Sequence, residues 1–203
     1  MEIEFKKDKI IFSKNLNKLD ELAILFSKIL SEHDIPHVFL SGYIAILFGR
    51  NRASEDIDVV CEVVPWEKYN ELWEDLYQEL ECIITDDINE SFTRYLMART
   101  AVRFSIKNEL IPNIELKFAR TELHRRAIND RIYVDLNGNN IPISPLELQI
   151  AYKLYLGSEK DIEDARFLFK LFEEHLNKHK LIDIIKELDY DLDKARTYLG
   201  WSY

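Results

Sequence analysis

The sequence predicts an α+β (mixed α/β) fold, in which a lobe with a mixed sheet flanked by helices is followed by a C-terminal helical lobe. Residues 37–49 and residues 57–80 each show a strand pattern followed by a helix pattern, the succession that builds a sheet with helices on its faces. Residues 131–143 carry a hairpin signal, and only helical patterns follow them. We therefore expect two domains, residues 1–143 and residues 144–203.

The first predicted elements are a helix, a strand and a second helix. Apolar residues recur every three to four positions over residues 16–30, which is the spacing of one helix face. The apolar run at residues 37–40 suits a strand and ends at Ser41-Gly42, where a glycine allows a tight turn. A short helix at residues 43–48 is expected to follow, so this stretch reads as strand, turn and helix.

The middle of the chain alternates between strand and helix patterns. The β-branched residues of 57–63 indicate a buried strand, and residues 66–80 have the spacing of a strongly amphipathic helix. We interpret residues 92–97 as a helix. Alternating apolar residues over 102–106 and over 111–118 predict two more strands.

The last part of the chain begins with a hairpin and continues as helices. Asn137-Gly138 is a strong hairpin signal between two strand patterns. The segment from Ser144 to Glu147 has the form of a capping box, with Pro145 at the first helical position. The predicted helices cover residues 145–156, 161–176, 178–188 and 192–199.

Charge and composition limit the classes of partner. The formal net charge of −10 disfavours nonspecific binding to nucleic acids, because these are polyanions. One basic cluster nevertheless occurs, and acidic residues interleave with it. Its members are Arg120, Arg125, Arg126 and Arg131, with His124 among them. We interpret this cluster mainly as a solvated helix face, with binding of an acceptor substrate as the alternative.

The cysteines and the apolar runs indicate a cytoplasmic protein. Cys61 and Cys82 are too few for a disulfide framework and lack metal-ligand spacing, so we expect buried free thiols in a reducing compartment. The N-terminus lacks the apolar segment of a signal peptide. No run approaches the ~20 apolar residues that cross a bilayer, so no membrane partner is expected.

Asp56-Ile57-Asp58 is the motif that points most directly to chemistry. Alternation along a strand places both carboxylates on one face while Ile57 enters the core. Two neighbouring carboxylates repel each other unless a cation lies between them. The motif is therefore either an exposed pair without a role or a site for a hard cation such as Mg²⁺ or Mn²⁺.

A second motif could bind phosphate beside these carboxylates. Thirteen residues, enough for a short helix and a loop, separate Gly42 from Asp56. The helix that begins after Ser41 can therefore point its N-terminal amides at the same place, and such amides bind phosphate. A phosphate-binding turn beside a divalent cation suits reactions of nucleoside triphosphates. Arg50 and Arg52 could contact phosphate or solvate the loop.

Three further groups complete the candidate residues. Glu115 and Lys117 alternate with apolar residues on the 111–118 strand, so they share its opposite face, where Lys117 is expected to be a salt-bridge partner. Asp161 and Asp164 could join the site, but we favour an N-cap and a first-turn acid of the following helix. His175 and His179 lie four residues apart, yet no third metal ligand accompanies them.

Together, these motifs resemble the signature of the nucleotidyltransferase superfamily, in which a Gly-Gly or Gly-Ser turn precedes an acid, an apolar residue and a second acid on the next strand. The pattern is most similar to the branch with AbiEii-type toxins of type IV toxin-antitoxin systems and minimal nucleotidyltransferase-like proteins. The matching segments are Val38-Phe39-Leu40-Ser41-Gly42, Gly49-Arg50-x-Arg52, Asp56-Ile57-Asp58, Pro145-x-x-Leu148 to Lys153, and Lys160-Asp161-x-x-Asp164-Ala165.

This resemblance implies transfer of a nucleoside monophosphate from an NTP to a hydroxyl acceptor on tRNA, a protein or a small molecule. Asp56 and Asp58 are expected to hold Mg²⁺ or Mn²⁺, with Glu115 as the third metal ligand and as a group that helps to deprotonate the acceptor. Ser41 and Gly42 are expected to bind the β and γ phosphates. The remaining predicted nucleotide-binding residues are Arg50, Arg52 and Lys153.

Two departures from the family pattern keep a second reading open. Ser41 replaces the first glycine and requires an ordinary backbone conformation. Glu115 replaces the more usual aspartate, so its carboxylate lies one methylene further out. The alternative is a catalytically silent interaction or nucleotide-binding module with the same fold. Resemblance to the toxin branch also implies a cognate antitoxin as a partner.

Overall fold

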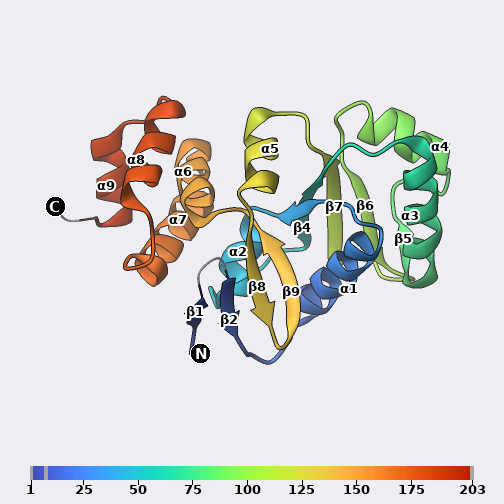
Figure 1. Ribbon diagram of the computed structural model, residues 1–203, viewed down its shortest axis with the longest axis horizontal. Coiled ribbons are helices and arrows are strands. Elements are labelled where there is room, and N and C mark those ends of the chain that lie inside the picture. The colour runs from blue at the N-terminus through green and yellow to red at the C-terminus, as the bar shows by residue number, and fades with distance from the viewer. Residues whose placement is uncertain (1, 7–8, 202–203) are drawn as a thin grey trace.

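The computed structural model describes residues 2–6 and 9–201, and across them nine strands form one mixed sheet with helices on its faces (Figure 1). The strands lie in the order β1-β2-β8-β9-β3-β4-β7-β6-β5. Their bounds are β1 (Glu4–Lys6), β2 (Lys9–Phe12), β3 (His37–Phe39), β4 (Asp56–Cys61), β5 (Leu80–Cys82), β6 (Val102–Ile106), β7 (Asn113–Phe118), β8 (Ile132–Leu136) and β9 (Asn139–Ile143). The predicted fold class is confirmed.

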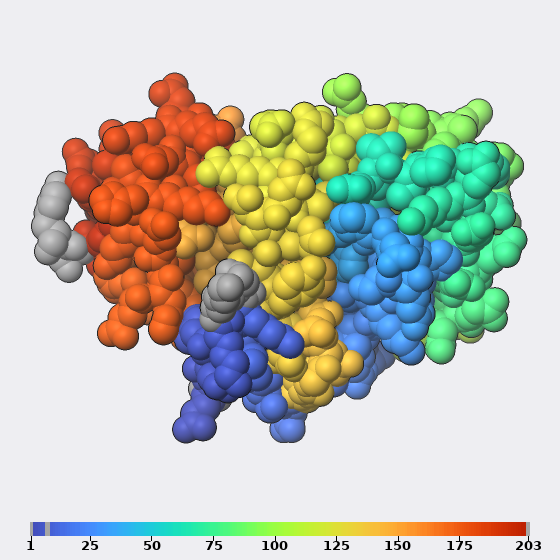
Figure 2. All heavy atoms as spheres, in the orientation of Figure 1, coloured from blue at the N-terminus to red at the C-terminus, as the bar shows by residue number. Residues whose placement is uncertain are grey.

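Helices lie between the strands along the chain and follow the last of them. Their bounds are α1 (Lys18–Glu32), α2 (Gly42–Leu47), α3 (Trp66–Glu79), α4 (Ile88–Glu90), the π-helical segment η1 (Ser91–Leu96), α5 (Glu122–Asn129), α6 (Leu146–Leu156), α7 (Glu159–Phe172), α8 (Lys178–Glu187) and α9 (Leu192–Leu199). Helices α6 to α9 gather at one end of the molecule, where they lie directly against the rest of the chain (Figures 1 and 2). Among the described residues, no helix combines the length and the apolar character that crossing a membrane requires.

The middle of the sheet brings the predicted site residues to neighbouring strands. Strand β4 pairs in parallel with β7, and this register sets Asp58 opposite Glu115. On its other side β4 pairs with β3 in antiparallel orientation. Strand β3 contacts β9 through the pair Phe39 and Ile143, which joins the two halves of the sheet. The end of β3 and the start of β4 therefore lie close together, as the motif spacing requires.

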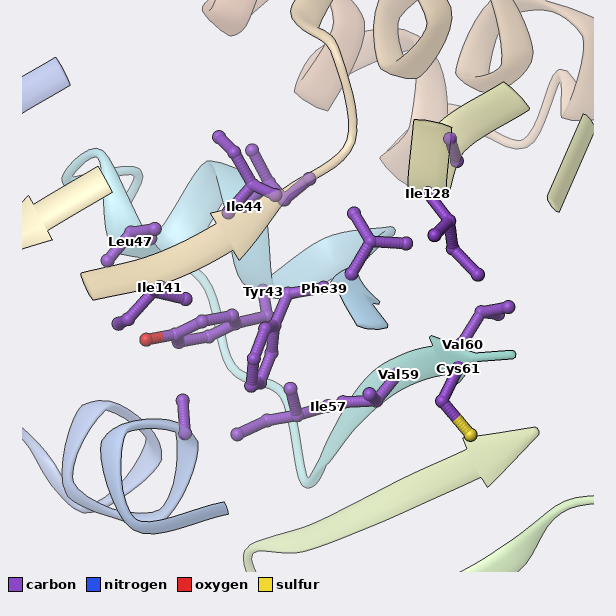
Figure 3. Packing of buried hydrophobic residues seen from close by; sticks show 14 of the residues in the cluster. Phe39, Tyr43, Ile44, Leu47, Ile57, Val59, Val60, Cys61, Ile128 and Ile141 are labelled. Atoms are coloured by element: carbon purple, nitrogen blue, oxygen red, sulfur yellow. The ribbon is translucent and has the colours of Figure 1, made fainter. Parts of the chain in front are cut away.

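The core packs directly beneath this part of the sheet. Ile57 and Val59 alternate with the two aspartates of β4 and are fully buried, as the strand pattern predicts. Phe39 and Tyr43 lie beside them with ring centroids 5.8 Å apart (Figure 3). The Tyr43 hydroxyl donates to the buried Asp20 carboxylate at 3.2 Å. Helix α2 is thus fixed against α1 immediately after the predicted phosphate-binding turn.

The capping box predicted at the start of α6 is wrong. Pro145 is the N-cap residue, and no side chain caps this helix. The Ser144 amide instead donates to the carbonyl oxygen of Phe39 at 3.0 Å, which extends the contact between β9 and β3. Glu147 accepts a hydrogen bond from the Asn177 amide at 2.8 Å. Tertiary contacts therefore use the groups that a local capping box would have used.

The N-terminal strands and the C-terminal helices share one core. Phe5 of β1 stacks on His175, with ring centroids 3.6 Å apart. Phe48, just after α2, packs edge-on against Phe172 of α7 at 4.7 Å. His175 is therefore a packing residue. The division of the chain into two folding units at residue 143 stays a prediction.

Candidate active site

A cleft of about 320 Å³ lies where the central strands meet α5 and α6. Ser41 at the end of β3, Asp58 of β4 and Lys117 of β7 line one side, and His124 of α5 and Lys153 of α6 line the other. Much of the remaining wall is apolar. It includes Leu40, Val60, Leu123, Ala127, Leu148, Tyr152 and Leu156. The cleft therefore combines an apolar wall with charged side chains from β4, β7 and α6.

Two of the three predicted acids lie side by side and share an ammonium group. The Lys117 Nζ atom lies 2.8 Å from Asp58 Oδ1 and 3.1 Å from Glu115 Oε2. Arg103 of β6 also contacts Glu115. Burial by itself raises the pKa of Glu115, but the bonds and charges of Lys117 and Arg103 outweigh burial and leave this pKa below its usual range. The Glu115 carboxylate is therefore ionised at neutral pH.

The third predicted acid, Asp56, is not among the residues that line the cleft. Asp56 is exposed at the start of β4, and its Oδ1 atom accepts a hydrogen bond from Ser54 Oγ at 3.2 Å. Its charge also acts on Arg52. Within residues 2–6 and 9–201, no three His, Cys, Asp or Glu side chains gather closely enough to hold a metal ion. The full metal-ligand set of Asp56, Asp58 and Glu115 therefore stays a prediction.

The pair formed by Asp58 and Glu115 nevertheless fits a cation. Two ionised carboxylates from adjacent strands already hold one positive charge between them, and that charge is the ammonium of Lys117. Carboxylate oxygens are the ligands that Mg²⁺ and Mn²⁺ prefer. The ammonium acts here as a stand-in cation, so the donor chemistry suits a hard divalent ion.

The turn after β3 has a strained backbone. Ser41 lies at φ 59° and ψ −135°, so the expectation that it adopts an ordinary conformation is wrong. To hold a residue with a Cβ atom in such a φ/ψ region costs on the order of 1–3 kcal/mol of folding free energy. The buried side chain of Gln149 holds this turn from α6, because its Oε1 accepts from the Ser41 amide at 3.2 Å and its Nε2 donates to the Ser41 carbonyl at 2.8 Å.

Gln149 is a site residue that the sequence analysis missed. Its signal in the sequence is faint, since it is a polar residue between Leu148 and Ile150 in an otherwise apolar stretch. Because the Ser41 amide already donates to Gln149, that amide can bind phosphate only if the bond to Gln149 is replaced.

At Gly42 the close packing of a neighbouring side chain requires the absence of a Cβ atom. An added Cβ would lie 2.9 Å from an Arg52 nitrogen, so glycine permits the close approach of this guanidinium.

The three predicted phosphate-binding cations converge on one buried carboxylate. Arg50 contacts Asp164, Arg52 lies 2.5 Å from it, and Lys153 Nζ lies 2.7 Å from it. Asp164 and Lys153 are 0% and 1% exposed. Lys153 also binds Asp161 at 2.9 Å. These cations therefore form a network between the loop after α2 and helices α6 and α7, which we call the Asp164 network.

Asp161 lies in the first turn of α7, as a helix-start acid would, but the predicted N-cap role is wrong and Asp164 lies beyond the first turn. Ser158 is the N-cap of α7, and its side chain accepts a hydrogen bond from the Asp161 amide. Burial lowers the pKa of Lys153; the bond and charge of Asp161 oppose this effect, and Arg52 and Arg50 add to it. Sequence alone left open whether the two acids belong to the site, and the structure joins both to the predicted cations.

The basic cluster around α5 behaves mainly as a solvated helix face. Arg125 pairs with Glu122 at 3.2 Å, and Arg126 pairs with Glu187 at 2.7 Å. His124 differs from these arginines because it lines the cleft, and its buried Nδ1 atom has no hydrogen-bond partner among the described residues. Burial lowers the pKa of His124, and the charge of Lys117 lowers it further against the attraction of Asp58. The imidazole is therefore neutral at pH 7.

Comparison with known proteins gives matches at the level of structure. No protein-family model and no curated protein matches the sequence. An antigenic nucleotidyltransferase-like protein from Paracoccidioides brasiliensis is similar over 90% of this chain and 92% of its own length, with 16% sequence identity and a TM-score of 0.59. The antibiotic-resistance factor ANT(2'')-Ia is similar over 85% of this chain and 93% of its own, with 12% identity and a TM-score of 0.53. The chain has the nucleotidyltransferase fold.

A second structure of ANT(2'')-Ia, in complex with adenylyl-2''-tobramycin, is also similar, with 15% identity over 83% of this chain and 95% of its own, and a TM-score of 0.51. At these identities the likeness establishes the fold and not the activity. The predicted resemblance to the nucleotidyltransferase superfamily is confirmed at the level of the fold. The resemblance to the AbiEii branch stays a prediction.

Within this nucleotidyltransferase fold the predicted site residues form two groups. Asp58 and Glu115 meet at Lys117, whereas Arg50, Arg52 and Lys153 form the Asp164 network. Lys153 is the link between the groups, because it belongs to the Asp164 network and also lines the cleft together with Asp58. The structure therefore supplies contact partners for these predicted residues, and their roles in binding stay predictions.

Proposed function

We propose that this protein transfers a nucleoside monophosphate from an NTP to a hydroxyl acceptor and releases pyrophosphate. The observation that carries the proposal is that Asp58, which lines the cleft together with the strained Ser41 turn, lies directly beside Glu115. Carboxylates that hold a cation beside a phosphate-binding turn are what such a transfer needs. The nucleotidyltransferase fold supports the same conclusion.

Asp58 and Glu115 would hold Mg²⁺ or Mn²⁺, with Asp56 as the third ligand. A bound metal ion supplies neutralisation of the charge that develops on the phosphates. The protein groups would then position the triphosphate: Ser41 and Gly42 at the turn, and Lys153 from α6. Arg50 and Arg52 are committed to Asp164, so their contribution would be to hold the turn and Lys153 in place.

His124 would be better suited than Glu115 to accept the proton of the acceptor hydroxyl. The cations around Glu115 keep the pKa of its carboxyl low, which makes it a weak base. His124 is neutral and lines the cleft, and its buried Nδ1 atom has no hydrogen-bond partner among the described residues. We therefore assign Glu115 to metal binding and His124 to proton acceptance from the acceptor.

The acceptor would be a protein or small-molecule hydroxyl rather than tRNA. A net charge of −10 repels a polyanion, and the α5 arginines that could offset it pair with acidic residues. Among the similar structures, ANT(2'')-Ia has been solved in complex with an adenylylated small molecule, adenylyl-2''-tobramycin. The resemblance to AbiEii-type toxins extends the proposal to a toxin with a cognate antitoxin.

Transfer of label from an NTP tests the proposal. Each of the four NTPs, labelled at the α phosphate, is incubated with the protein, Mg²⁺ or Mn²⁺, and an aminoglycoside, a protein or tRNA. We expect label to appear on an acceptor with one pyrophosphate released per transfer, and Asp58→Asn to abolish both. Asp75→Asn is the control, because this exposed carboxylate pairs only with His33 among the described residues. Pyrophosphate release that survives Asp58→Asn would contradict the proposal.

A noncatalytic nucleotide-binding module is the second candidate. The observation in its favour is the neutralisation of Asp58 and Glu115 by Lys117 and Arg103, which leaves less negative charge to attract a metal ion. Binding of an NTP without pyrophosphate release in the presence of every acceptor class would select this candidate. The same labelled NTPs therefore distinguish the two functions.

A further inference from the structure

Lys117 lines the cleft, and its ammonium forms ion pairs with two carboxylates at once. Its ammonium bonds to carboxylates on two adjacent strands, at 2.8 Å from Asp58 and 3.1 Å from Glu115. Those carboxylates are only 28% and 13% exposed, so water screens the three charges weakly. The two short contacts therefore fix the ammonium between the two strands.

The ammonium lies where a divalent ion bound by these acids would have to lie. A divalent ion held jointly by Asp58 and Glu115 would bind oxygen atoms of the same two carboxylates that Lys117 now contacts, at about 2.0–2.2 Å. Two like charges at such a separation repel strongly in a partly buried site. Lys117 and a metal ion therefore cannot occupy the pair of carboxylates together.

The cleft beside Lys117 offers its ammonium an alternative position. Its side chain is 34% exposed and lines the cleft, so rotation about its flexible stem would carry the ammonium away from the acids and into the cleft. An anionic phosphate in the cleft would receive it. Arg103 contacts the other carboxylate oxygen of Glu115, so Glu115 keeps one cationic partner when Lys117 leaves.

We propose that Lys117 is an internal cation that closes the metal site in the free protein and exchanges with the divalent ion. The inference deepens the proposed function, and it rests on that function only in taking Asp58 and Glu115 as metal ligands. Removal of the ammonium should therefore tighten metal binding even without nucleotide or acceptor. Lys117 acts as a positioning residue in this exchange.

Titration of Mn²⁺ in the absence of nucleotide tests the exchange. Free Mn²⁺ is followed by electron paramagnetic resonance for the wild type and for Lys117→Met. We expect Lys117→Met to bind Mn²⁺ at least about tenfold more tightly than the wild type. Lys28→Met is the matched control, since it removes one positive charge from a side chain that is 70% exposed on α1. Its affinity for Mn²⁺ should equal that of the wild type.

A double variant shows whether any gain arises at the proposed site. In Asp58→Asn/Lys117→Met the tighter binding should disappear, because one of the two carboxylates has lost its charge. Equal Mn²⁺ affinity of Lys117→Met and the wild type would overturn the inference. So would a gain of the same size in Lys28→Met, or one that persists in the double variant. The Mn²⁺ titrations use neither nucleotide nor acceptor, so they test the exchange separately from the transfer reaction. If Lys117→Met binds Mn²⁺ more tightly but the labelled-NTP assay gives no pyrophosphate, only the proposed function is rejected.

Discussion

Ser41 combines a side chain with a backbone conformation that favours glycine. Replacement by glycine removes the clash of the Cβ atom at φ 59°, although glycine also makes the unfolded chain more flexible. We expect Ser41→Gly to raise the free energy of unfolding by about 1 kcal/mol in urea denaturation. The control Ser13→Gly changes an exposed residue with a negative φ and should be neutral or slightly destabilising. If both variants lose stability equally, Ser41 is not strained.

His37 links the stability of the central strands to pH. Its Nδ1 donates to the Ile35 carbonyl at 2.9 Å, so its Nε2 must accept from Ser27 Oγ at 3.0 Å, and the ring is neutral. Burial lowers the pKa of His37 from 6.5 to about 4, the bond to Ile35 opposes this shift, and the charge of Arg131 adds to it. A protonated ring would have to donate to Ser27 Oγ instead, and its charge would be buried without a carboxylate partner among the causes of the shift.

The pH dependence follows from this lowered pKa. Between about pH 4 and 6.5 the unfolded chain binds a proton at His37 that the folded chain does not, so stability rises with pH across this window. Acidification from pH 6.5 to 4 should therefore cost roughly 3 kcal/mol through His37. His37→Gln should lack this contribution, so the difference in unfolding free energy between wild type and variant should shrink as pH falls. Parallel pH profiles of the two proteins would refute the assignment.

At the scale of elements, the Asp164 network fastens the loop after α2 to helices α6 and α7. Asp164→Asn would leave two guanidinium groups and the buried ammonium of Lys153 without their shared carboxylate. We expect a loss of about 3 kcal/mol in the free energy of unfolding, measured by urea denaturation. Glu163→Gln is the control, because this neighbouring carboxylate is 55% exposed and should change stability by less than about 0.5 kcal/mol. Equal losses would mean that the network does not stabilise the fold.

At the scale of the whole molecule, the sequence predicted what short-range patterns determine. Residues 102–106 alternate cleanly and form β6 with those bounds, and residues 192–199 form α9. The short strand β5 and the hairpin of β1 and β2 were not predicted, because three or four residues carry too little pattern. Their pairing depends on partners elsewhere in the chain, such as β8 beside β2.

In the candidate site, too, the sequence revealed residues with a local pattern and missed contacts between distant parts of the chain. Asp58, Glu115 and Lys117 were found because strand alternation fixes their shared face. Gln149 was missed, since its partner Ser41 lies 108 residues away and no local motif connects them. The partnership of Asp164 with Arg50 spans 114 residues, so sequence could identify the two charges but not join them. Long-range pairing is the physical information that residue patterns lack.

Calorimetric titration of ATP, CTP, GTP and UTP with Mg²⁺ tests most directly the central claim that the cleft is a nucleotide site. The account predicts that at least one nucleotide binds the wild type only when Mg²⁺ is present. It also predicts that Asp58→Asn weakens this binding by about tenfold or more and that Asp75→Asn leaves it unchanged. Absence of nucleotide binding by the wild type, or equal binding by Asp58→Asn, would contradict the account.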